Sequence, residues 1–319
     1  MSSVSSPASG RRYVLVSPCR NEAAYLHRTL DSVIAQSVTP MLWIIVDDGS
    51  TDETPQILAD YAARYPFIKV VPKPDREHRA VGPGVIEAFY AGLAHVDLDQ
   101  TDYVCKLDVD LDLPPRYFEI LMERMEADPR IGTASGKPYF RDGQGRWISE
   151  RCGDEMSVGM TKFYRVACFQ DIGGFVREVM WDGIDCHKAR QLGWIACSWD
   201  DTDLRFEHLR PMGSSQQNIL VGRARHGFGQ YFMGSDPFYF TATALYRLTH
   251  KPYLTGGLHM LRGYFGALLS RKPQLADPEL RAFIRRFQRQ ALMKGKKQAV
   301  REIEAAQAGQ WRSRFGGGA

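Results

Sequence analysis

Four short apolar segments, each followed by a helical pattern of apolar residues, constrain the fold of this chain more than any other feature. The segments are Tyr13–Ser17, Met41–Val46, Ile68–Val71 and Tyr103–Leu107, and their lengths suit buried β-strands. Strand–helix–strand units of this kind build parallel sheets with right-handed crossovers. The pattern therefore predicts an α/β fold with a doubly wound, mostly parallel sheet flanked by helices.

Three aspartates follow the fourth apolar segment at alternate positions. Asp108, Asp110 and Asp112 lie at the strand's carboxyl end, because Pro114 and Pro115 forbid its continuation. In open α/β sheets ligands bind at this end, and alternate spacing sends the three carboxylates to one side. Carboxylates so close repel one another unless a cation lies among them. The pattern predicts an Mg²⁺ or Mn²⁺ site, and for Asp112 a helix cap is the alternative.

The composition is typical of a globular protein and gives no indication of nucleic-acid binding. The chain has 319 residues and a net charge of +4, from 41 basic and 37 acidic residues, which is too mild to predict a nucleic-acid partner. Its 6 cysteines include no CxxC pair, which favours reduced thiols and a cytoplasmic location. No segment reaches the roughly 20 apolar residues of a membrane-spanning helix.

Beyond Pro115 the regular alternation is lost. The pattern predicts a strand over 131–140, a helix over 161–174 and a long basic helix over 278–306. In this last helix, arginines and lysines stand beside an apolar stripe. Two interpretations remain open for it: a helix lying on an anionic membrane surface, or an ordinary helix packed on its domain.

Four motifs, in this order and spacing, resemble those of the family 2 glycosyltransferases, which adopt the GT-A fold. They are Pro18-Cys-Arg-Asn-Glu22, Val46-Asp-Asp-Gly-Ser-Thr-Asp52, Leu107-Asp-Val-Asp110 and Trp181-Asp-Gly-Ile-Asp185. The resemblance implies an inverting transfer of a sugar from a nucleotide donor to a hydroxyl acceptor, assisted by Mg²⁺ or Mn²⁺. The family's bacterial members of this type serve polysaccharide or glycolipid synthesis.

The resemblance implies roles for the residues that would face the metal and the phosphates. Asp110 matches the last residue of the family's DxD motif and is the expected metal ligand, while Asp108 is expected to contact the sugar, the ribose or the metal. His208 is a candidate third metal ligand or phosphate donor, with a purely structural role as the alternative. Arg210 is expected to clamp phosphate, because a guanidinium meets phosphate oxygens bidentately.

Other motif residues match the family's nucleotide-binding loops. Asp48 matches the residue that hydrogen-bonds the base, and a turn followed by a helix cap is the alternative for its segment. Pro18, Asn21 and Glu22 match the first loop, in which Glu22 would accept a bond from the ribose or orient Arg20. Many relatives carry an aromatic residue at the position of Arg20, which leaves its role open.

Inversion requires a carboxylate that takes the proton of the attacking hydroxyl. Asp182 matches this base, although Trp181 replaces the glutamate that precedes it in the family, and Trp181 is a candidate to stack on a sugar. A helix cap is the alternative role for Asp182, with Asp185 as the fallback base.

The resemblance, which covers roughly residues 13–210, and the Ser-rich and Gly-rich ends together divide the chain into parts. We expect a disordered leader over 1–12, a GT-A catalytic domain over 13–225, a mainly helical C-terminal extension over 226–310 and a disordered tail over 311–319. Within the catalytic domain, the nucleotide-binding half would cover 13–115 and the acceptor half 116–225. The extension would contact the acceptor or the cytoplasmic face of the inner membrane.

The implied partners are a UDP- or GDP-sugar and a saccharide or lipid-linked acceptor. One alternative is a polyprenyl-phosphate glycosyl synthase, and another is a non-catalytic nucleotide-sugar-binding module, against which the intact Asp108, Asp110 and Asp182 argue. A dinucleotide-dependent dehydrogenase is disfavoured because the loop Pro18–Glu22 lacks a G-x-G-x-x-G pattern.

Overall fold

A computed structural model describes residues 11–74, 82–210, 219–250 and 252–315 of the chain. These residues fall into two compact units. Unit 1 lies within Met1–Gly174 and Ile195–Arg210, and unit 2 within Phe175–Trp194 and Pro211–Ala319. Residues 1–10 of the expected leader and 316–319 of the expected tail lie outside the described residues.

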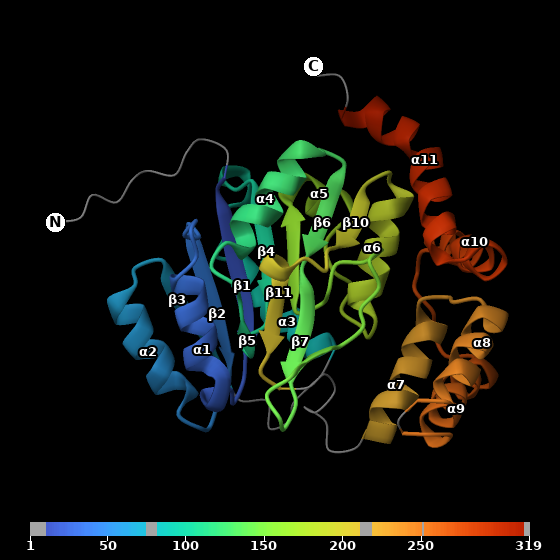
Figure 1. The fold of residues 1–319 in the computed structure, drawn as a ribbon, viewed down its shortest axis with the longest axis horizontal. Helices are drawn as coiled ribbons and strands as arrows, with labels where there is room; N and C mark the ends of the chain where they lie inside the picture. The colour runs from blue at the N-terminus through green and yellow to red at the C-terminus, as the bar shows by residue number, and fades with distance from the viewer. Residues whose placement is uncertain (1–10, 75–81, 211–218, 251, 316–319) are drawn as a thin grey trace. The chain divides into compact units, whose positions relative to one another are not determined.

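Unit 1 contains a seven-stranded sheet with the strand order β10-β6-β9-β4-β1-β2-β3 (Figure 1). Its strands are β1 (Tyr13–Cys19), β2 (Leu42–Asp48), β3 (Ile68–Lys73), β4 (Tyr103–Leu107), β6 (Ile131–Ser135), β9 (Thr161–Arg165) and β10 (Ile195–Ser198). Strand β9 runs antiparallel to both neighbours, and the other pairs are parallel. The predicted α/β fold with a mostly parallel sheet is confirmed.

Helices cover both faces of this sheet because successive side chains of each strand point to opposite faces. On one face, α1 (Ala23–Ile34), α2 (Thr54–Arg64) and α4 (Tyr117–Ala127) bury their apolar sides against residues such as Leu15 and Ile45.

On the other face, α3 (Pro83–Leu93) packs on Ile44 and Val46, and α5 (Val166–Asp171) joins it through a ring contact between Phe169 and Phe89. Gly92 lets α3 approach closely, since a Cβ there would lie 2.7 Å from Cγ1 of Val16. Two 3-10 turns, Leu98–Gln100 and Thr202–Leu204, complete the connections.

A second, four-stranded sheet in unit 1 has the order β5-β11-β7-β8. Its strands are β5 (Leu111–Asp112), β7 (Lys137–Arg141), β8 (Trp147–Ser149) and β11 (Arg205–His208). The prediction of one strand over 131–140 is wrong, because the chain changes sheets at Gly136. The backbone of Gly136 approaches Leu204 so closely that a Cβ at position 136 would lie 1.8 Å from the Leu204 carbonyl oxygen.

The predicted helix over 161–174 is also wrong in its first half. Residues 161–165 form β9, and the helix α5 begins only at Val166. Phe163 of β9 lies among Tyr13, Tyr103 and Phe118, at ring-centroid distances of 5.9, 5.2 and 5.7 Å. Packing in this aromatic core, which no local pattern reveals, fixes the segment as a strand.

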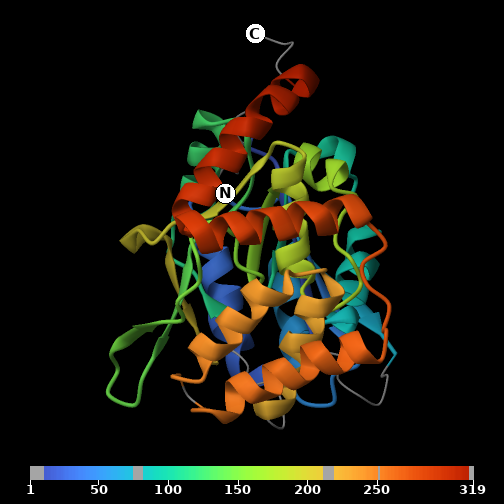
Figure 2. The same ribbon diagram turned by 90° about the vertical axis from the view of Figure 1, so that its right-hand side faces the viewer.

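Unit 2 is helical, which confirms the mainly helical C-terminal region (Figure 2). Its helices are α6 (Trp181–Gln191), α7 (Ile219–Phe232), α8 (Pro237–Arg247), α9 (Thr255–Leu269), α10 (Pro278–Lys294) and α11 (Lys296–Phe315). Helices α7 and α9 pack closely because Gly227 and Gly263 each face a backbone carbonyl of the other helix, where a Cβ would lie at 2.0 and 1.9 Å. None of the helices in the described ranges has the length and apolar character to cross a membrane.

The end of the chain differs from two expectations. The single helix predicted over 278–306 breaks at Gly295, whose φ of +82° suits glycine, and α11 then continues to Phe315. The expected disorder is therefore wrong for residues 311–315. Trp311 is buried and packs edge-on against Trp194, with ring centroids 5.7 Å apart.

Candidate functional site

The carboxyl ends of three neighbouring parallel strands bring the motif loops of unit 1 to one edge of the sheet. In the register, Cys19 of β1 lies beside Asp47 of β2, and Val16 of β1 beside Lys106 of β4. Asp48 ends β2, and the loops that leave β1 and β4 carry Glu22 and Asp110, so residues far apart in sequence gather at the edge where α/β sheets bind ligands.

Arg210 joins two of these loops. Its Nη2 donates to Oδ2 of Asp110 at 2.7 Å and to Oε1 of Glu22 at 3.0 Å. The backbone holds the arrangement, because the N–H of Leu209 donates to the Asp110 carbonyl at 2.9 Å. Burial alone would raise the pKa of Asp110, but His208 and Arg210 outweigh it and keep that pKa below its usual range. The structure thus brings together the predicted residues Glu22, Asp110 and Arg210.

His208 completes this group from the last position of β11. Its Nε2 lies 3.5 Å from Oδ2 of Asp110, and its Nδ1 lies 2.9 Å from Oε2 of Glu150. Burial acts to lower the pKa of His208, but the two carboxylates outweigh it and raise that pKa to about 9. The imidazole is therefore held between two carboxylates, with one ring nitrogen toward Asp110 and the other toward Glu150.

Asp108 lies in a different environment from Asp110. Its side chain is 31% exposed, against 8% for Asp110, and it forms an ion pair with buried Lys106. Lys106 also donates to the Gly159 carbonyl at 3.0 Å. Burial raises the pKa of Asp108, the Lys106 ammonium opposes that rise, and the Asp110 carboxylate adds to it. The exposed fractions make Asp108 the more accessible carboxylate of the two.

Asp112 is separated from the other two aspartates, contrary to the prediction that all three face one side. Its Oδ2 accepts from Arg28 at 2.5 Å, and Arg28 also pairs with Glu207 at 2.9 Å. The short strand β5 causes this, since it pairs Asp112 with Glu207 of β11. Asp112 does not cap α4 either, because Arg116 occupies the N-cap position.

The segment that follows the apolar run of β2 forms the predicted turn. The Asp47 carboxylate accepts from the Ser50 N–H at 3.0 Å, and Asp52 accepts from the Thr54 N–H at 3.0 Å, as a turn requires. The N-cap residue of α2 is Glu53, which makes no side-chain cap bond. The Asp48 carboxylate instead pairs with Lys73 of β3, with Nζ 3.2 Å from Oδ1. The Asp48 carboxylate is thus held by a lysine of the neighbouring strand β3, a contact that the sequence did not indicate.

The first loop is tied to the second through Asn21, whose φ of 52° lies in the left-handed region that asparagine tolerates. Its Oδ1 accepts from the Thr51 N–H at 2.8 Å, and its own N–H donates to Ser50 at 2.9 Å. Arg20 donates to the Asp48 carbonyl at 2.8 Å, and Pro18 lies within β1, opposite Val46. These contacts fix the position of both loops.

The donors around Asp110 suit part of a divalent metal site. Asp110 and His208 present a carboxylate oxygen and an imidazole nitrogen 3.5 Å apart. Asp108 precedes Asp110 by two residues in the sequence. Across the described ranges, no three His, Cys, Asp or Glu side chains converge as a complete metal cluster. Mg²⁺ and Mn²⁺ sites in nucleotide enzymes commonly take only one or two protein carboxylates and complete the shell with phosphates and water. The residues present therefore fit such an ion.

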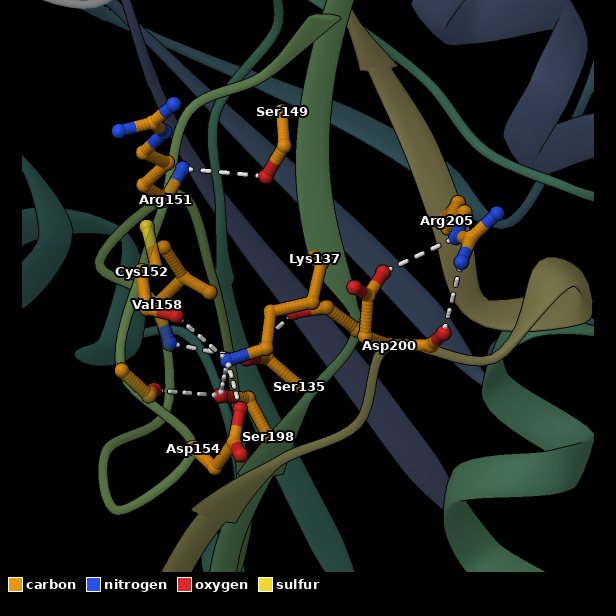
Figure 3. A network of polar contacts seen from close by, with 12 residues as sticks. Ser135, Lys137, Ser149, Arg151, Cys152, Asp154, Val158, Ser198, Asp200 and Arg205 are labelled. Atoms are coloured by element: carbon orange, nitrogen blue, oxygen red, sulfur yellow. Dashed lines mark hydrogen bonds and ion pairs between the residues drawn. The ribbon is translucent and has the colours of Figure 1, made fainter.

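Glu150, which sequence analysis missed, precedes a segment that contacts a polar network around Lys137 (Figure 3). The buried Lys137 ammonium donates to the Cys152 carbonyl at 2.8 Å and to Ser198 Oγ at 2.9 Å, and it pairs with Asp154 at 2.9 Å. Ser198 in turn donates to the Gly153 carbonyl at 3.0 Å. The network anchors the chain that follows Glu150. An isolated lysine in a strand gives no sequence signal for this role.

Asp182 lies in unit 2, in the first turn of α6. The cap interpretation is wrong, because Met180 occupies the N-cap position with a φ of 65° and makes no side-chain cap bond. Asp182 is half-buried, whereas Asp185 is 2% exposed and accepts from the Cys186 N–H at 2.6 Å. Trp181 is buried and packs edge-on against Phe175 at 4.8 Å.

Comparison with known sequences gives matches to one family. The model of the family described as glycosyl transferase family 2 matches residues 14–180. The poly-beta-1,6-N-acetyl-D-glucosamine synthase of Staphylococcus aureus strain COL is 29% identical over 127 residues, which are 39% of this chain and 28% of the relative. The synthase of Staphylococcus epidermidis is 27% identical over 125 residues. The chain thus matches little more than a quarter of the length of these relatives.

Solved structures share the fold. The mannosyltransferase PcManGT from Pyrobaculum calidifontis, in complex with GDP-Man and Mn²⁺, has a TM-score of 0.50 at 18% identity and covers 96% of this chain and 89% of its own. GalNAc-T7 with UDP, GalNAc and Mn²⁺ has a TM-score of 0.52 at 14% identity, with 84% of this chain and 59% of its own covered. At these identities the likeness shows the fold alone.

Proposed function

The chain belongs to glycosyl transferase family 2 and is a glycosyltransferase, and we propose that it transfers a sugar from a UDP- or GDP-sugar to a hydroxyl acceptor with inversion. Polysaccharide or glycolipid synthesis is the proposed setting, at the cytoplasmic side of the inner membrane. The staphylococcal relatives are named as polysaccharide synthases, and the structures of similar fold were solved with GDP-Man or UDP. These names support the donor class and the type of product.

The observation that carries the proposal is the group formed by Glu22, Asp110, His208 and Arg210. A nucleoside diphosphate that leaves the sugar gains negative charge, so its site must supply positive charge and hydrogen-bond donors. Arg210 supplies both at the carboxyl edge of the sheet, and the carboxylates of Asp110 and Glu22 fix the guanidinium at 2.7 and 3.0 Å. A diphosphate placed here would meet donors that are already oriented.

Asp110, His208 and Asp108 are the residues that would hold Mg²⁺ or Mn²⁺. A divalent cation bound there supplies a Lewis acid that neutralises the phosphate oxygens. Glu150 holds the imidazole of His208 through Nδ1 at 2.9 Å, which leaves Nε2 on the side of Asp110. The presence of Mn²⁺ in the two structures of similar fold supports this choice of ion.

The remaining site residues would bind the nucleoside and activate the acceptor. Asp48 accepts a hydrogen bond from the base, with its carboxylate oriented by Lys73, and Glu22 accepts one from the ribose. Asp182 acts as the general base and takes the proton of the acceptor hydroxyl as the oxygen attacks the anomeric carbon. The greater exposure of Asp182 relative to Asp185 supports this assignment. The acceptor is a saccharide or a lipid-linked sugar.

Isothermal titration calorimetry with UDP, GDP, TDP and CMP, each with and without Mn²⁺, tests the donor assignment. We expect one nucleoside diphosphate to bind in a metal-dependent manner, and Arg210→Ala to weaken that binding. Arg146→Ala is the matched control, because Arg146 is 68% exposed and pairs with Asp142 in the turn between β7 and β8. Binding that is absent for all four nucleotides, or insensitive to Arg210→Ala, would contradict the proposal.

A further inference from the structure

Helices α8 and α9 expose large apolar side chains that no part of unit 2 covers. Phe238 and Leu269 are 80% and 82% exposed. The most exposed apolar side chains of the two helices are Phe238, Leu245, Tyr246, Leu258, Leu268 and Leu269. We call the surface that these six residues form the α8–α9 face. So many exposed large apolar side chains on one helical pair mark an interaction surface.

The exposed residues follow helical spacing, so each helix presents them on one side. On α8, Leu245 follows Phe238 by seven residues, and on α9 Leu269 follows Leu258 by eleven, in both cases close to whole numbers of turns. The opposite sides build the core of this helical pair, where Phe240 stacks on Tyr264 with ring centroids 4.5 Å apart. The α8–α9 face is therefore not needed to fold unit 2.

The segment that carries this face, from α7 to the residue before Asp277, is rich in basic residues. Residues 219–276 contain seven lysines and arginines but one acidic residue, Asp236. The Asp236 side chain is fully buried and accepts from Arg289 at 2.6 Å, so it presents no charge to solvent. Arg262 is exposed one turn after Leu258, within the apolar stripe of α9. The exposed charge near the face is positive.

Two further arginines lie at the edge of the face. A surface hollow is lined by Phe238 and Leu268 of the face together with Arg285 and Arg289 of α10. Arg285 donates through Nε to the Gly234 carbonyl at 2.9 Å, and this bond fixes the position of its guanidinium. A lipid presents a phosphate headgroup next to its acyl chains. Guanidinium groups bind phosphate, and apolar side chains beside them contact the acyl chains.

One of the two sequence interpretations of the basic helix over 278–306 placed a membrane-binding surface there. In the structure, the apolar side of α10 is already buried in unit 2, through Leu280, Phe283, Ile284 and Phe287. Only Leu292 and Met293, near the end of α10, remain 49% and 74% exposed. This burial favours the interpretation of an ordinary packed helix for α10, and most of the exposed apolar side chains of unit 2 lie on other helices, α8 and α9 among them.

We propose that the α8–α9 face docks unit 2 onto the surface of an anionic lipid bilayer. Apolar side chains would enter the boundary between headgroups and acyl chains, while Arg262 and Arg285 meet lipid phosphates. A second copy of the chain is the competing occupant, but two such faces would bring exposed positive charges together, and like charges oppose association. The inference does not depend on the transfer reaction, because it concerns a surface in unit 2 alone.

Vesicle flotation of the full-length chain tests this directly, without nucleotide or acceptor. We expect the chain to float with vesicles of phosphatidylcholine and phosphatidylglycerol, to bind pure phosphatidylcholine far more weakly, and to be released by high salt. Arg262→Glu should weaken binding to anionic vesicles about tenfold, since each basic residue near an anionic surface contributes about 1 kcal/mol and the reversal adds a repulsive charge. The double variant Phe238→Ser/Leu269→Ser should weaken it about tenfold or more by removing inserted apolar area.

The controls carry the same changes at other exposed sites. Met41→Ser alters an exposed apolar residue of unit 1 that is 46% exposed, and Lys297→Glu reverses an exposed charge on α11. Both should float as the unchanged chain does, and circular dichroism should show that all variants are folded. Lack of binding to anionic vesicles, or an equal loss in the control variants, would overturn the proposal. So would a dimer in sedimentation analysis that Phe238→Ser/Leu269→Ser dissociates, because the face would then belong to a second copy.

Discussion

One nitrogen of Arg210, Nη2, lies 2.7 Å from Oδ2 of Asp110 and 3.0 Å from Oε1 of Glu22. The two carboxylates come from loops after different strands, and Arg210 follows a third strand. The ion pair is largely buried, since 18%, 8% and 5% of the three side chains are exposed. Arg210 therefore has two roles, because it pairs with two buried carboxylates and presents its guanidinium at the edge of the sheet.

Arg210→Lys should separate charge from geometry. A lysine keeps the positive charge but cannot reproduce the planar fork that binds a phosphate bidentately. We expect nucleoside diphosphate affinity to fall about tenfold, because a hydrogen bond to a charged group contributes about 1.5–3 kcal/mol. Calorimetry measures this fall, with Arg146→Lys as the control. An unchanged affinity would mean that Arg210 serves only Asp110 and Glu22.

Glu150→Gln should weaken metal binding although Glu150 is not an expected ligand. The Glu150 carboxylate accepts from His208 Nδ1 at 2.9 Å and so orients Nε2 toward Asp110. Loss of such a partner commonly costs about 10–100-fold in metal affinity. Mn²⁺ binding followed by electron paramagnetic resonance gives the readout without any turnover.

Asp154→Asn is the matched control for Glu150→Gln, because it removes another carboxylate from the same segment. The Asp154 side chain is 69% exposed and pairs with Lys137. Equal effects of the two changes would show that Glu150 acts only by ordering the segment.

Lys137→Met should loosen the segment after β8. Lys137 is 3% exposed, and its ammonium holds the Cys152 carbonyl, Ser198 and Asp154 (Figure 3). A buried acceptor left without its donor costs about 1–3 kcal/mol. We expect faster amide hydrogen exchange over 150–158 and a lower unfolding midpoint. Normal protection of this segment in a folded Lys137→Met variant would contradict the assigned role.

The sequence could predict the sheet and the motif loops because both depend on local patterns. Apolar runs at Tyr13, Met41 and Tyr103 locate the central strands, and parallel pairing then brings their carboxyl ends together. Glu22, Asp110 and Arg210 were predicted as site residues from motif position, and the structure places them within hydrogen-bonding distance of one another.

Long-range contacts explain what the sequence could not predict. Three charged residues that the sequence did not indicate contact partners far along the chain: Glu150, Lys73 and Lys137, with partners 58, 25 and 61 positions away. The residues next to a charged residue in the sequence do not reveal whether it is buried or what it pairs with. The strand predicted over 131–140 is divided at Gly136, where the backbone passes close to Leu204. Asp112 was separated from Asp110 by pairing in the second sheet, which alternation alone does not reveal.

Asp236 should make the stability of unit 2 depend on pH in acid. Burial acts to raise the pKa of Asp236, but Arg289 and the N–H groups of Tyr239 and Phe238 outweigh it and lower that pKa. A depressed carboxyl pKa stabilises the folded state above the unfolded pKa of about 3.9, and the contribution is lost as pH falls through the folded pKa. Asp236→Asn should cost about 1–2 kcal/mol at neutral pH, mainly through loss of the buried ion pair with Arg289, since asparagine caps a helix about as well as aspartate.

Urea unfolding followed by circular dichroism measures this difference. The gap between Asp236→Asn and the unchanged chain should be constant above about pH 5 and should shrink below it. Asp60→Asn, at an exposed position of α2, should show no such dependence. A gap that grows as the pH falls would have the wrong sign for a depressed carboxyl pKa.

Asp182→Asn should abolish most turnover while leaving donor binding intact. Asparagine keeps the size of the side chain but cannot take a proton from the acceptor, and a positioned general base contributes about 10²–10⁴-fold to the rate. We expect kcat to fall by about that factor, with little change in nucleotide affinity or in the unfolding midpoint. Asp185→Asn is the contrast, because Asp185 is 2% exposed and bonds the Cys186 N–H, so its loss should lower stability more than kcat. If Asp182→Asn retains turnover and a stable Asp185→Asn variant loses it, the base is Asp185.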